Sequence, residues 1–407
     1  MAVFGGSLSG RISAMPSKSM SHRALICAAL CAGKSSISSF ALSEDTRSTL
    51  CCIEALGAKA ALSGSAIHIE GISSPLSHAT LNCNESGTTY RLLYPAAPLL
   101  ADRADFILAP SLAARPMEPI ISLLKSKGAK ADSLSVSGRY PPGDFAIPGN
   151  ISSQFISGLI FALSLLEGES RIIPTTPVQS AGYIEMTRSC LHAFGGDTQW
   201  QDGSLLVRPA KFHPAEITIP GDHSHAAMFL AAGAIYGPVT VTGLAPDPLQ
   251  RDSQMPAILA RMGAKVTAAG DSVTVSPGEL IGTDVDASDI PDIVPAIAAA
   301  ACAARGKTRI YNAARLRFKE SDRIAAIAEE LTRLGADVEE LPDGLVIRGG
   351  KKLKSARCLC HNDHRIAMML AILGGLCGGV ELDDPRCTAK SAPNFFAEFT
   401  SLGGKIT

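Results

Sequence analysis

Gly263-Ala-Lys-Val-Thr-Ala-Ala-Gly-Asp-Ser-Val-Thr-Val275 is the stretch of sequence that decides the fold. Gly263-Ala264 predicts the end of a helix, because glycine adopts the left-handed conformation that often follows a last helical turn. Two segments of alternating polarity follow and are joined by Gly270-Asp271, and this pattern is typical of a β-hairpin. The stretch therefore predicts a helix that leads directly into a hairpin.

The same arrangement recurs six times along the chain, roughly every 70 residues. Each repeat opens with a polar cluster of helix-capping residues and later stops a helix at a Gly-Ala or Gly-Gly pair. The clusters begin at Ser17, Glu85, Ser152, Gly221, Asp289 and Asn362, and the stops are Gly57-Ala58, Gly128-Ala129, Gly195-Gly196, Gly263-Ala264, Gly335-Ala336 and Gly403-Gly404. The helices after the clusters, such as 297–304, are apolar nearly all round. The pattern predicts an α/β repeat protein with buried helices and outer sheets.

The chain of 407 residues is long enough for two domains. The sixth repeat stops soon after Gly404 without a hairpin partner. Val3-Phe4, a Gly5-Gly6 turn and residues 8–12 offer the missing segment, so we expect the N-terminus to complete this repeat. One domain would then comprise residues 1–15 plus 220–407, the other residues 16–219, with three repeats in each.

Composition argues against several classes of partner. The net charge is −1, the pI is about 6.8 and aromatic residues make up 5%, so neither nucleic acid nor a membrane surface is an expected partner. We find no signal-peptide pattern and no apolar run long enough to span a bilayer. The 11 cysteines lack zinc-site spacing and favour buried thiols in the cytoplasm. No association helix is evident, so a monomer is expected.

Several helix starts carry basic residues. Lys18 and Arg23 follow Ser17, and Arg91 and Arg365 occupy similar places in later repeats. A cation at a helix start opposes the helix dipole, so these positions favour an anionic ligand over simple solvation. Arg115 indicates little by itself.

Two further segments allow two interpretations each. Asp292 lies between Pro291 and an apolar helix, where a carboxylate could cap the helix or act as a base. Lys319-Glu-Ser-Asp-Arg323 is either a charged helix start with a Glu–Arg pair or part of a site. Lys390, just before the last helix, is unremarkable alone.

Taken together and in order, nine short motifs resemble those of the 5-enolpyruvylshikimate-3-phosphate synthases. They are Ser17-Lys-Ser-Met-Ser-His-Arg23, Ser86-Gly-Thr-Thr-Tyr-Arg91, Arg115-Pro-Met117, Ser152-Ser-Gln-Phe155, Ser180-Ala-Gly-Tyr183, Ile290-Pro-Asp292, Lys319-Glu-Ser-Asp-Arg323, Asn362-Asp-His-Arg365 and Lys390. The resemblance runs from about residue 10 to the end of the chain. It implies the two-domain enolpyruvyl transferase fold, with six βαβαββ repeats, three per domain.

The resemblance also implies an activity. These enzymes move the enolpyruvyl group of phosphoenolpyruvate to the 5-hydroxyl of shikimate 3-phosphate, on the shikimate pathway to chorismate and the aromatic amino acids. The active site would lie in the interdomain cleft, with shikimate 3-phosphate on the 16–219 side. Phosphoenolpyruvate and the acid/base carboxylates would lie on the other side. Neither a metal nor an organic cofactor is implied.

Individual roles follow from the matched motifs. The residues that match the shikimate 3-phosphate site are Lys18, Ser19, Arg23, Ser152, Ser153, Gln154, Ser180, Tyr183, Asp292 and Lys319. The residues that match the phosphoenolpyruvate site are Lys18, Gly87, Arg91, Arg115, Gln154, Arg323, Arg365 and Lys390. Asp292 and Glu320 match the acid/base pair, with Lys18 and Lys390 as further catalytic candidates.

Three positions depart from the family pattern. Glu85 replaces a frequent Asn, Arg315 replaces an Asn found in some members, and Cys387 lies near Lys390 at a variable position.

Two other functions compete with this one. A sister transferase acting on UDP-N-acetylglucosamine would have Lys-Asn near the start and a Cys before the Arg-Pro, and this chain has neither. A non-catalytic binding protein would not need the intact set of charged residues.

Overall fold

The computed structural model describes residues 1–407 except 5, 7 and 247. Contacts divide the chain into two compact units: unit 1 comprises Met1–Met15 and Gly221–Thr407, and unit 2 comprises Pro16–Pro220. Each unit has its own hydrophobic core. The described residues form six four-stranded sheets, and in each sheet two strands pair in parallel before two antiparallel neighbours follow.

Unit 2 holds three of these sheets, ordered β14-β3-β5-β4, β6-β7-β9-β8 and β10-β11-β13-β12. Its strands are β3 (Lys34–Ser38), β4 (Lys59–Ser63), β5 (Ala66–Glu70), β6 (Leu76–Asn84), β7 (Ala101–Leu108), β8 (Lys130–Ala131), β9 (Ser135–Ser137), β10 (Asp144–Ile147), β11 (Ser170–Pro174), β12 (Asp197–Gln201), β13 (Ser204–Arg208) and β14 (Glu216–Thr218). Its helices are α1 (Lys18–Leu30), α2 (Glu44–Ala55), α3 (Gly87–Leu93), α4 (Ala97–Leu100), α5 (Pro110–Ala113), α6 (Glu118–Ser126), α7 (Ser153–Leu163) and α8 (Ala181–Ala193).

Unit 1 holds the other three sheets, ordered β16-β17-β15-β2, β18-β19-β21-β20 and β22-β23-β1-β24. Its strands are β1 (Ala2–Phe4), β2 (Gly10–Ser13), β15 (Val239–Thr242), β16 (Lys265–Ala269), β17 (Ser272–Ser276), β18 (Asp284–Asp286), β19 (Gly306–Tyr311), β20 (Asp337–Leu341), β21 (Gly344–Gly349), β22 (Ala356–Cys358), β23 (Val380–Leu382) and β24 (Lys405–Ile406). Its helices are α9 (His223–Ile235), α10 (Met255–Arg261), α11 (Val294–Ala303), α12 (Arg323–Arg333), α13 (His364–Cys377) and α14 (Phe395–Ser401), with short 3-10 turns η1 (Arg251–Gln254), η2 (Pro291–Ile293), η3 (Ala314–Phe318) and η4 (Pro385–Lys390).

The structure confirms the predictions made from local sequence signals. The hairpin around Gly270-Asp271 forms, with Ala269 opposite Ser272. The first glycine of all six helix stops has a φ between 86° and 105°, a conformation that costs glycine little because it has no Cβ. The six repeats therefore end their second helices by the same means.

The two ends of the chain meet in the sixth sheet. Strand β1 lies between β23 and β24, with Val3 opposite both Val380 and Ile406. This confirms that the N-terminus completes the sixth repeat, although Gly5 of the expected turn lies outside the described residues.

The second N-terminal segment completes a different sheet. We expected residues 8–12 in the sixth repeat, and this was wrong: β2 pairs in parallel with β15 of the fourth repeat, Ile12 opposite Val241. The reason is that β14, which precedes the fourth repeat in sequence, pairs with β3 of the first repeat, Ile217 opposite Ile37. The edge of β15 is thereby left for β2.

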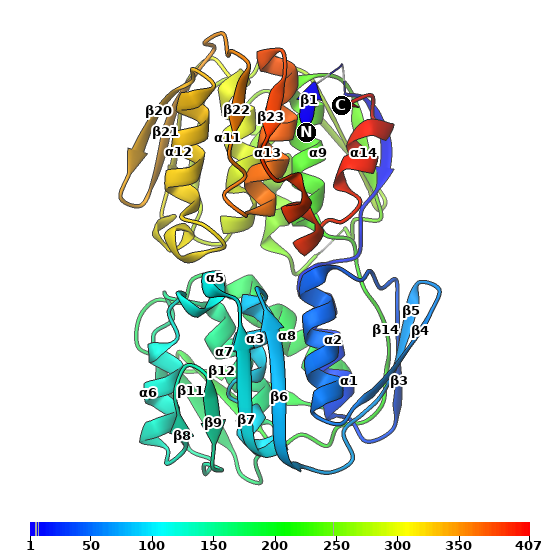
Figure 1. Cartoon of the computed structure of the whole chain (residues 1–407), viewed down its shortest axis with the longest axis vertical. Helices are drawn as coiled ribbons and strands as arrows, with labels where there is room; N and C mark the ends of the chain where they lie inside the picture. The colour runs from blue at the N-terminus through cyan, green and yellow to red at the C-terminus, as the bar shows by residue number, and fades with distance from the viewer. Residues whose placement is uncertain (5, 7, 247) are drawn as a thin grey trace. The chain divides into compact units, whose positions relative to one another are not determined.

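The interior of unit 1 is built from apolar helices, as the sequence predicts. Every residue from Val294 to Cys302 in α11 is buried, and α11 packs against α9 and α13 (Figure 1). Removing this continuous apolar surface from water is the main force that holds the helices together. None of the described helices has the length and apolarity needed to cross a bilayer.

Candidate active site

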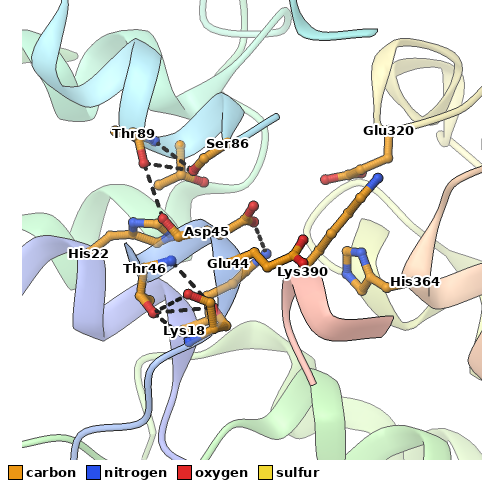
Figure 2. Close-up of polar contacts among 12 residues, drawn as sticks. Lys18, His22, Glu44, Asp45, Thr46, Ser86, Thr89, Glu320, His364 and Lys390 are labelled. Atoms are coloured by element: carbon orange, nitrogen blue, oxygen red, sulfur yellow. Dashed lines mark hydrogen bonds and ion pairs between the residues drawn. The ribbon is translucent and has the colours of Figure 1, made fainter. Parts of the chain in front are cut away.

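In unit 2, the first helix begins at a charged pair. Ser17 caps α1 by accepting a hydrogen bond from the Met20 amide. The ammonium of Lys18 lies 2.8 Å from the carboxylate of Asp45 in the first turn of α2 (Figure 2). Only 14% of the Lys18 side chain is exposed. The pair therefore holds a largely buried cation at a helix start.

Arg23, one turn further along α1, is 1% exposed and held by neutral groups. Its Nε donates to Thr187 Oγ1 at 2.7 Å, and its two Nη atoms donate to the carbonyls of Ser19 and Tyr183 at 2.7 and 2.9 Å. Burial lowers the pKa of Arg23 to about 10. A buried guanidinium is costly without a counter-charge, and this favours an anion beside it.

Arg91 and Gln154 connect α3 with α7. Arg91 donates to Gln154 Oε1 at 3.1 Å and to the Pro116 carbonyl at 3.2 Å. Gln154 in turn donates to Thr88 Oγ1 at 2.9 Å. The Arg91 guanidinium also lies over the Phe155 ring. These contacts fix the side chain of Gln154 between two helix starts.

Gly87 begins α3 directly beside Arg115. A Cβ built at Gly87 would lie 2.9 Å from Nη1 of Arg115 and 3.6 Å from Cδ1 of Leu112. The missing side chain thus leaves room for the buried Arg115 guanidinium. The structure therefore brings together two residues that the sequence placed in the phosphoenolpyruvate site.

The predicted phosphate-binding serines occupy the starts of two neighbouring helices. Ser152 caps α7 and Ser153 is its first residue, while Ser180 precedes α8. The two helices pack against each other. Ser180 has a left-handed φ of 54°, and its side chain forms no capping hydrogen bond, so its hydroxyl does not serve the helix. Tyr183, in the first turn of α8, is half-buried.

In unit 1, one arginine binds three carboxylates. Arg323 is 1% exposed at the start of α12. Its Nε donates to Asp363 at 2.7 Å, Nη1 to Asp292 at 2.9 Å and Nη2 to Glu320 at 2.6 Å. Burial acts to lower the pKa of Arg323, but the three carboxylates outweigh burial and raise it. The guanidinium is therefore a permanent cation that orients both predicted acid/base carboxylates.

Asp292 is also surrounded by other cations. Lys319 Nζ lies 3.5 Å and Arg365 Nε 3.7 Å from its Oδ1. Burial lowers the pKa of Lys319 and the Arg323 charge lowers it further, while Asp292 only partly compensates. A lysine with a lowered pKa beside a carboxylate can accept a proton at lower pH than usual.

The two interpretations of Asp292 differ in the partner that its carboxylate would have. Helix α11 follows η2 and has no side-chain capping hydrogen bond at its start. Asp292 directs its carboxylate to Arg323, and this contact favours a place in the Arg323 cluster over capping of α11. The Glu320–Arg323 pair that the simpler interpretation predicted does form, but it belongs to the same cluster as Asp292.

The start of α13 adds two more predicted residues to unit 1. Arg365 is buried and donates from Nη1 to the Ser224 carbonyl at 3.4 Å. Lys390, which is 6% exposed at the end of η4, donates to the Asn362 carbonyl at 2.6 Å. His364 is fully buried beside them. Figure 2 shows the side chains of Glu320, His364 and Lys390.

Three acidic residues of the site were missed by sequence reasoning. Asp45 and Asp363 hold Lys18 and Arg323, and their positions at helix starts were a usable signal. Asp252 is fully buried in η1, and the Ser224 hydroxyl donates to it. Burial and the nearby Asp292 raise the pKa of Asp252 to about 7. Nothing in the local sequence marks Asp252.

The three departures from the family pattern are all accommodated. Ser111 donates to Glu85 at 3.2 Å, and Arg315 donates to the Ser288 carbonyl. Cys387 is buried in η4.

The family model for EPSP synthase (3-phosphoshikimate 1-carboxyvinyltransferase) matches residues 4–399. The chain belongs to the EPSP synthase family. A 3-phosphoshikimate 1-carboxyvinyltransferase of Clostridium perfringens is 39% identical over 98% of this chain and 96% of the relative. One of Clostridioides difficile is 38% identical over 100% of this chain and 98% of the relative.

Solved structures agree with this assignment. The EPSP synthase of Acinetobacter baumannii superposes with a TM-score of 0.81 at 25% identity, covering 100% of this chain and 99% of that one. The enolpyruvyl transferase NikO of Streptomyces tendae superposes with a TM-score of 0.78 at 18% identity, covering 100% and 98%, and shows the fold alone. The expected enolpyruvyl transferase fold of the EPSP synthases is confirmed.

Proposed function

We propose that this chain transfers the enolpyruvyl group of phosphoenolpyruvate to the 5-hydroxyl of shikimate 3-phosphate. The products are 5-enolpyruvylshikimate 3-phosphate and phosphate, and the reaction belongs to the pathway to chorismate. Membership of the EPSP synthase family supports this activity, together with relatives of that name along the full chain.

The reaction proceeds by addition and elimination. The 5-hydroxyl oxygen attacks C2 of phosphoenolpyruvate and loses its proton to a base, while C3 gains a proton. The tetrahedral intermediate then loses phosphate from C2 and a proton from C3, which restores the double bond. The enzyme therefore needs a base near the hydroxyl, a group that gives and retakes the C3 proton, and cations around the phosphate.

Unit 2 binds shikimate 3-phosphate in this proposal. Ser152, Ser153 and Ser180 hold its phosphate at two helix starts, where backbone N–H groups favour anions. Arg23 and Ser19 hold its carboxylate, Tyr183 also contacts this substrate, and Gln154 lies between the two substrates. The absence of a carboxylate among the described partners of buried Arg23 supports this role.

The remaining cations bind phosphoenolpyruvate in this proposal. Those proposed to bind it are Lys18, Arg91, Arg115, Arg323, Arg365 and Lys390, with Gly87 leaving room for the substrate. These cations would neutralise one phosphate and two carboxylates that otherwise repel one another.

Asp292 and Glu320 carry the proton transfers. Asp292 takes the 5-hydroxyl proton, assisted by Lys319 with its lowered pKa. Glu320 gives and retakes the C3 proton, with Lys18 and Lys390 as assisting cations. The shared contact of both carboxylates with one buried guanidinium supports this pairing most strongly, because it fixes two proton carriers relative to each other.

Phosphate release from phosphoenolpyruvate tests the proposal. We expect release with shikimate 3-phosphate and none with UDP-N-acetylglucosamine. Asp292→Ala should slow turnover by at least ~100-fold, the range of a lost general base. Release with the nucleotide sugar alone would assign the chain to the sister activity, and an Asp292→Ala variant with wild-type turnover would refute the assigned base.

We also propose that the enzyme works as a cytoplasmic monomer. All 11 cysteines are free thiols and ten of them are buried, which suits a reducing compartment. Sedimentation of the purified protein at assay concentration measures the oligomeric state, and a dimer would refute the second half of this proposal.

A further inference from the structure

The turn before α13 is held in an unfavourable backbone conformation. His361 and Asn362 are consecutive, neither is glycine, and their φ angles are 52° and 51°. His and Asn adopt this left-handed region more readily than most residues, but it still costs energy for any residue with a side chain, and two in succession are favoured only with support from their surroundings. The turn therefore needs an anchor outside itself.

A buried carboxylate from α12 provides that anchor. Glu330 is 0% exposed and contacts His361 Nε2 at 3.0 Å through Oε1. Its Oε2 accepts from the Leu359 amide at 3.1 Å and from Arg333 Nε at 3.2 Å. The hydrogen bond to Glu330 raises the pKa of His361, which favours a charged imidazolium in this pair. Asp383 secures the same segment from another side, by accepting from the Cys360 amide at 2.7 Å.

The residues after this anchor reach the catalytic cluster. The carbonyl of Asn362 accepts the ammonium of Lys390 at 2.6 Å. The next residue, Asp363, binds Arg323 at 2.7 Å. A change in the turn would therefore move one proposed catalytic lysine and one partner of the arginine that orients Asp292.

The same cluster could be read as a metal site. Among the described residues, Glu329, Glu330 and His361 bring potential ligand atoms within 4.8 Å of one another. However, Arg333 lies 2.7 Å from Glu329 and 3.2 Å from Glu330. This guanidinium balances one of the two carboxylate charges and would repel a metal cation.

We infer that Glu330 and His361 are a positioning pair that sets the placement of Lys390 by holding the left-handed turn 361–362. The inference rests on the proposed function, because Lys390 takes its catalytic role there. His361 and Glu330 touch neither substrate in this role. They act through the Asn362 carbonyl and the Asp363 carboxylate.

The His361→Asn variant removes the side-chain contact with Glu330 but still allows the left-handed backbone of the turn. Asparagine tolerates left-handed φ better than most residues, but its side chain is too short to reach Glu330. We expect kcat to fall about 10-fold through misplacement of Lys390, with a raised KM for phosphoenolpyruvate and an unchanged KM for shikimate 3-phosphate. Glu330→Gln, which keeps an acceptor for Leu359, should show a smaller change of the same kind. Glu339→Gln, an exposed glutamate paired with Arg348 outside this cluster, is the control and should change either constant less than about 2-fold.

A second readout does not depend on turnover. The rate at which an acylating reagent labels Lys390, followed by mass spectrometry, should rise several-fold in His361→Asn and remain at the wild-type rate in Glu339→Gln. Unchanged labelling together with a wild-type KM for phosphoenolpyruvate would overturn the inference. Loss of activity on EDTA treatment that Zn²⁺ restores would also overturn it, in favour of the metal site. A wild-type enzyme that releases no phosphate would refute the proposed function alone, since labelling still tests the pair.

Discussion

Arg323 and Asp292, 31 residues apart in sequence, form a hydrogen-bonded ion pair of 2.9 Å between Nη1 and Oδ1. The same guanidinium binds Glu320 and Asp363 through its other nitrogens. A planar fork can hold three carboxylates in fixed directions, whereas an ammonium cannot. The proposed acid and base thus owe their geometry to one side chain.

Replacement of the Arg323 guanidinium should affect the stability of the protein and its catalysis together. Arg323→Lys leaves at least one buried carboxylate without its partner, so we expect a loss of about 3 kcal/mol in the free energy of unfolding and a large fall in kcat. Calorimetry and steady-state kinetics measure the two effects. Arg348→Lys, an exposed arginine paired with Asp337 and Glu339, is the control. A fully active Arg323→Lys enzyme would show that the fork is dispensable.

Glu320→Gln should uncouple binding from proton transfer at C3. The amide keeps the shape of the side chain but cannot carry the proton, so kcat should fall about 100-fold with little change in either KM. The specific measurement is incorporation of deuterium from D₂O at C3 of phosphoenolpyruvate, which should fall in parallel with kcat. Deuterium exchange at the wild-type rate would assign the C3 proton to another group, with Lys18 and Lys390 as the candidates. Glu340→Gln, an exposed partner of Arg317, should leave both rates unchanged.

Gly87→Ala should weaken phosphoenolpyruvate binding without unfolding the protein. The new Cβ would lie 2.9 Å from Arg115 Nη1, and the flexible guanidinium can move away. Loss of one charge-assisted hydrogen bond corresponds to about a 10-fold higher KM for phosphoenolpyruvate, with KM for shikimate 3-phosphate unchanged. Arg115→Lys should reproduce this effect if displacement of the guanidinium is the cause. An increase in KM for both substrates would point instead to a general disturbance of α3.

Asp252 should make stability depend on pH between about pH 4 and pH 7. Burial raises its pKa to about 7 in the folded protein, so the native state binds the proton more tightly than the unfolded state does. Its contribution therefore falls as pH rises through this window. The Asp252→Asn variant has no titrating carboxyl at this position. Its free energy of unfolding relative to that of the wild type should therefore rise by about 2–3 kcal/mol between pH 5 and pH 8. Thermal melts across pH, with the exposed Asp271→Asn as control, measure the difference, and parallel curves for wild type and Asp252→Asn would contradict it.

The sequence predicted those parts of the molecule that depend on local chemistry. The left-handed glycines at Gly57 and Gly263 and the hairpin around Gly270 act within a few residues, so their signals are complete in one segment. The apolar helix that contains Ile297 could be placed in the interior for the same reason. The charged side chains of the candidate site were then predicted from their match to the family motifs.

What the sequence could not predict depends on contacts between distant segments. Whether β2 pairs with the fourth or the sixth repeat depends on which edge β14 leaves open, and no local pattern records this. The sharing of Arg323 among three carboxylates and the burial of Asp252 likewise arise only when several repeats pack together. The anchoring role of Glu330 could not be predicted, because nothing in the sequence pattern of its helix distinguishes this residue.

The insertion of β1 between β23 and β24 has a consequence for the order of events at the ribosome. Residues 16–220 can leave the exit tunnel and fold as a unit while the rest of the chain is still being translated. Ala2–Phe4 must wait until Val380–Leu382 and Lys405–Ile406 have been synthesised. These residues are made early but are among the last to find their partners, and a bulky fusion directly before them would burden this final step.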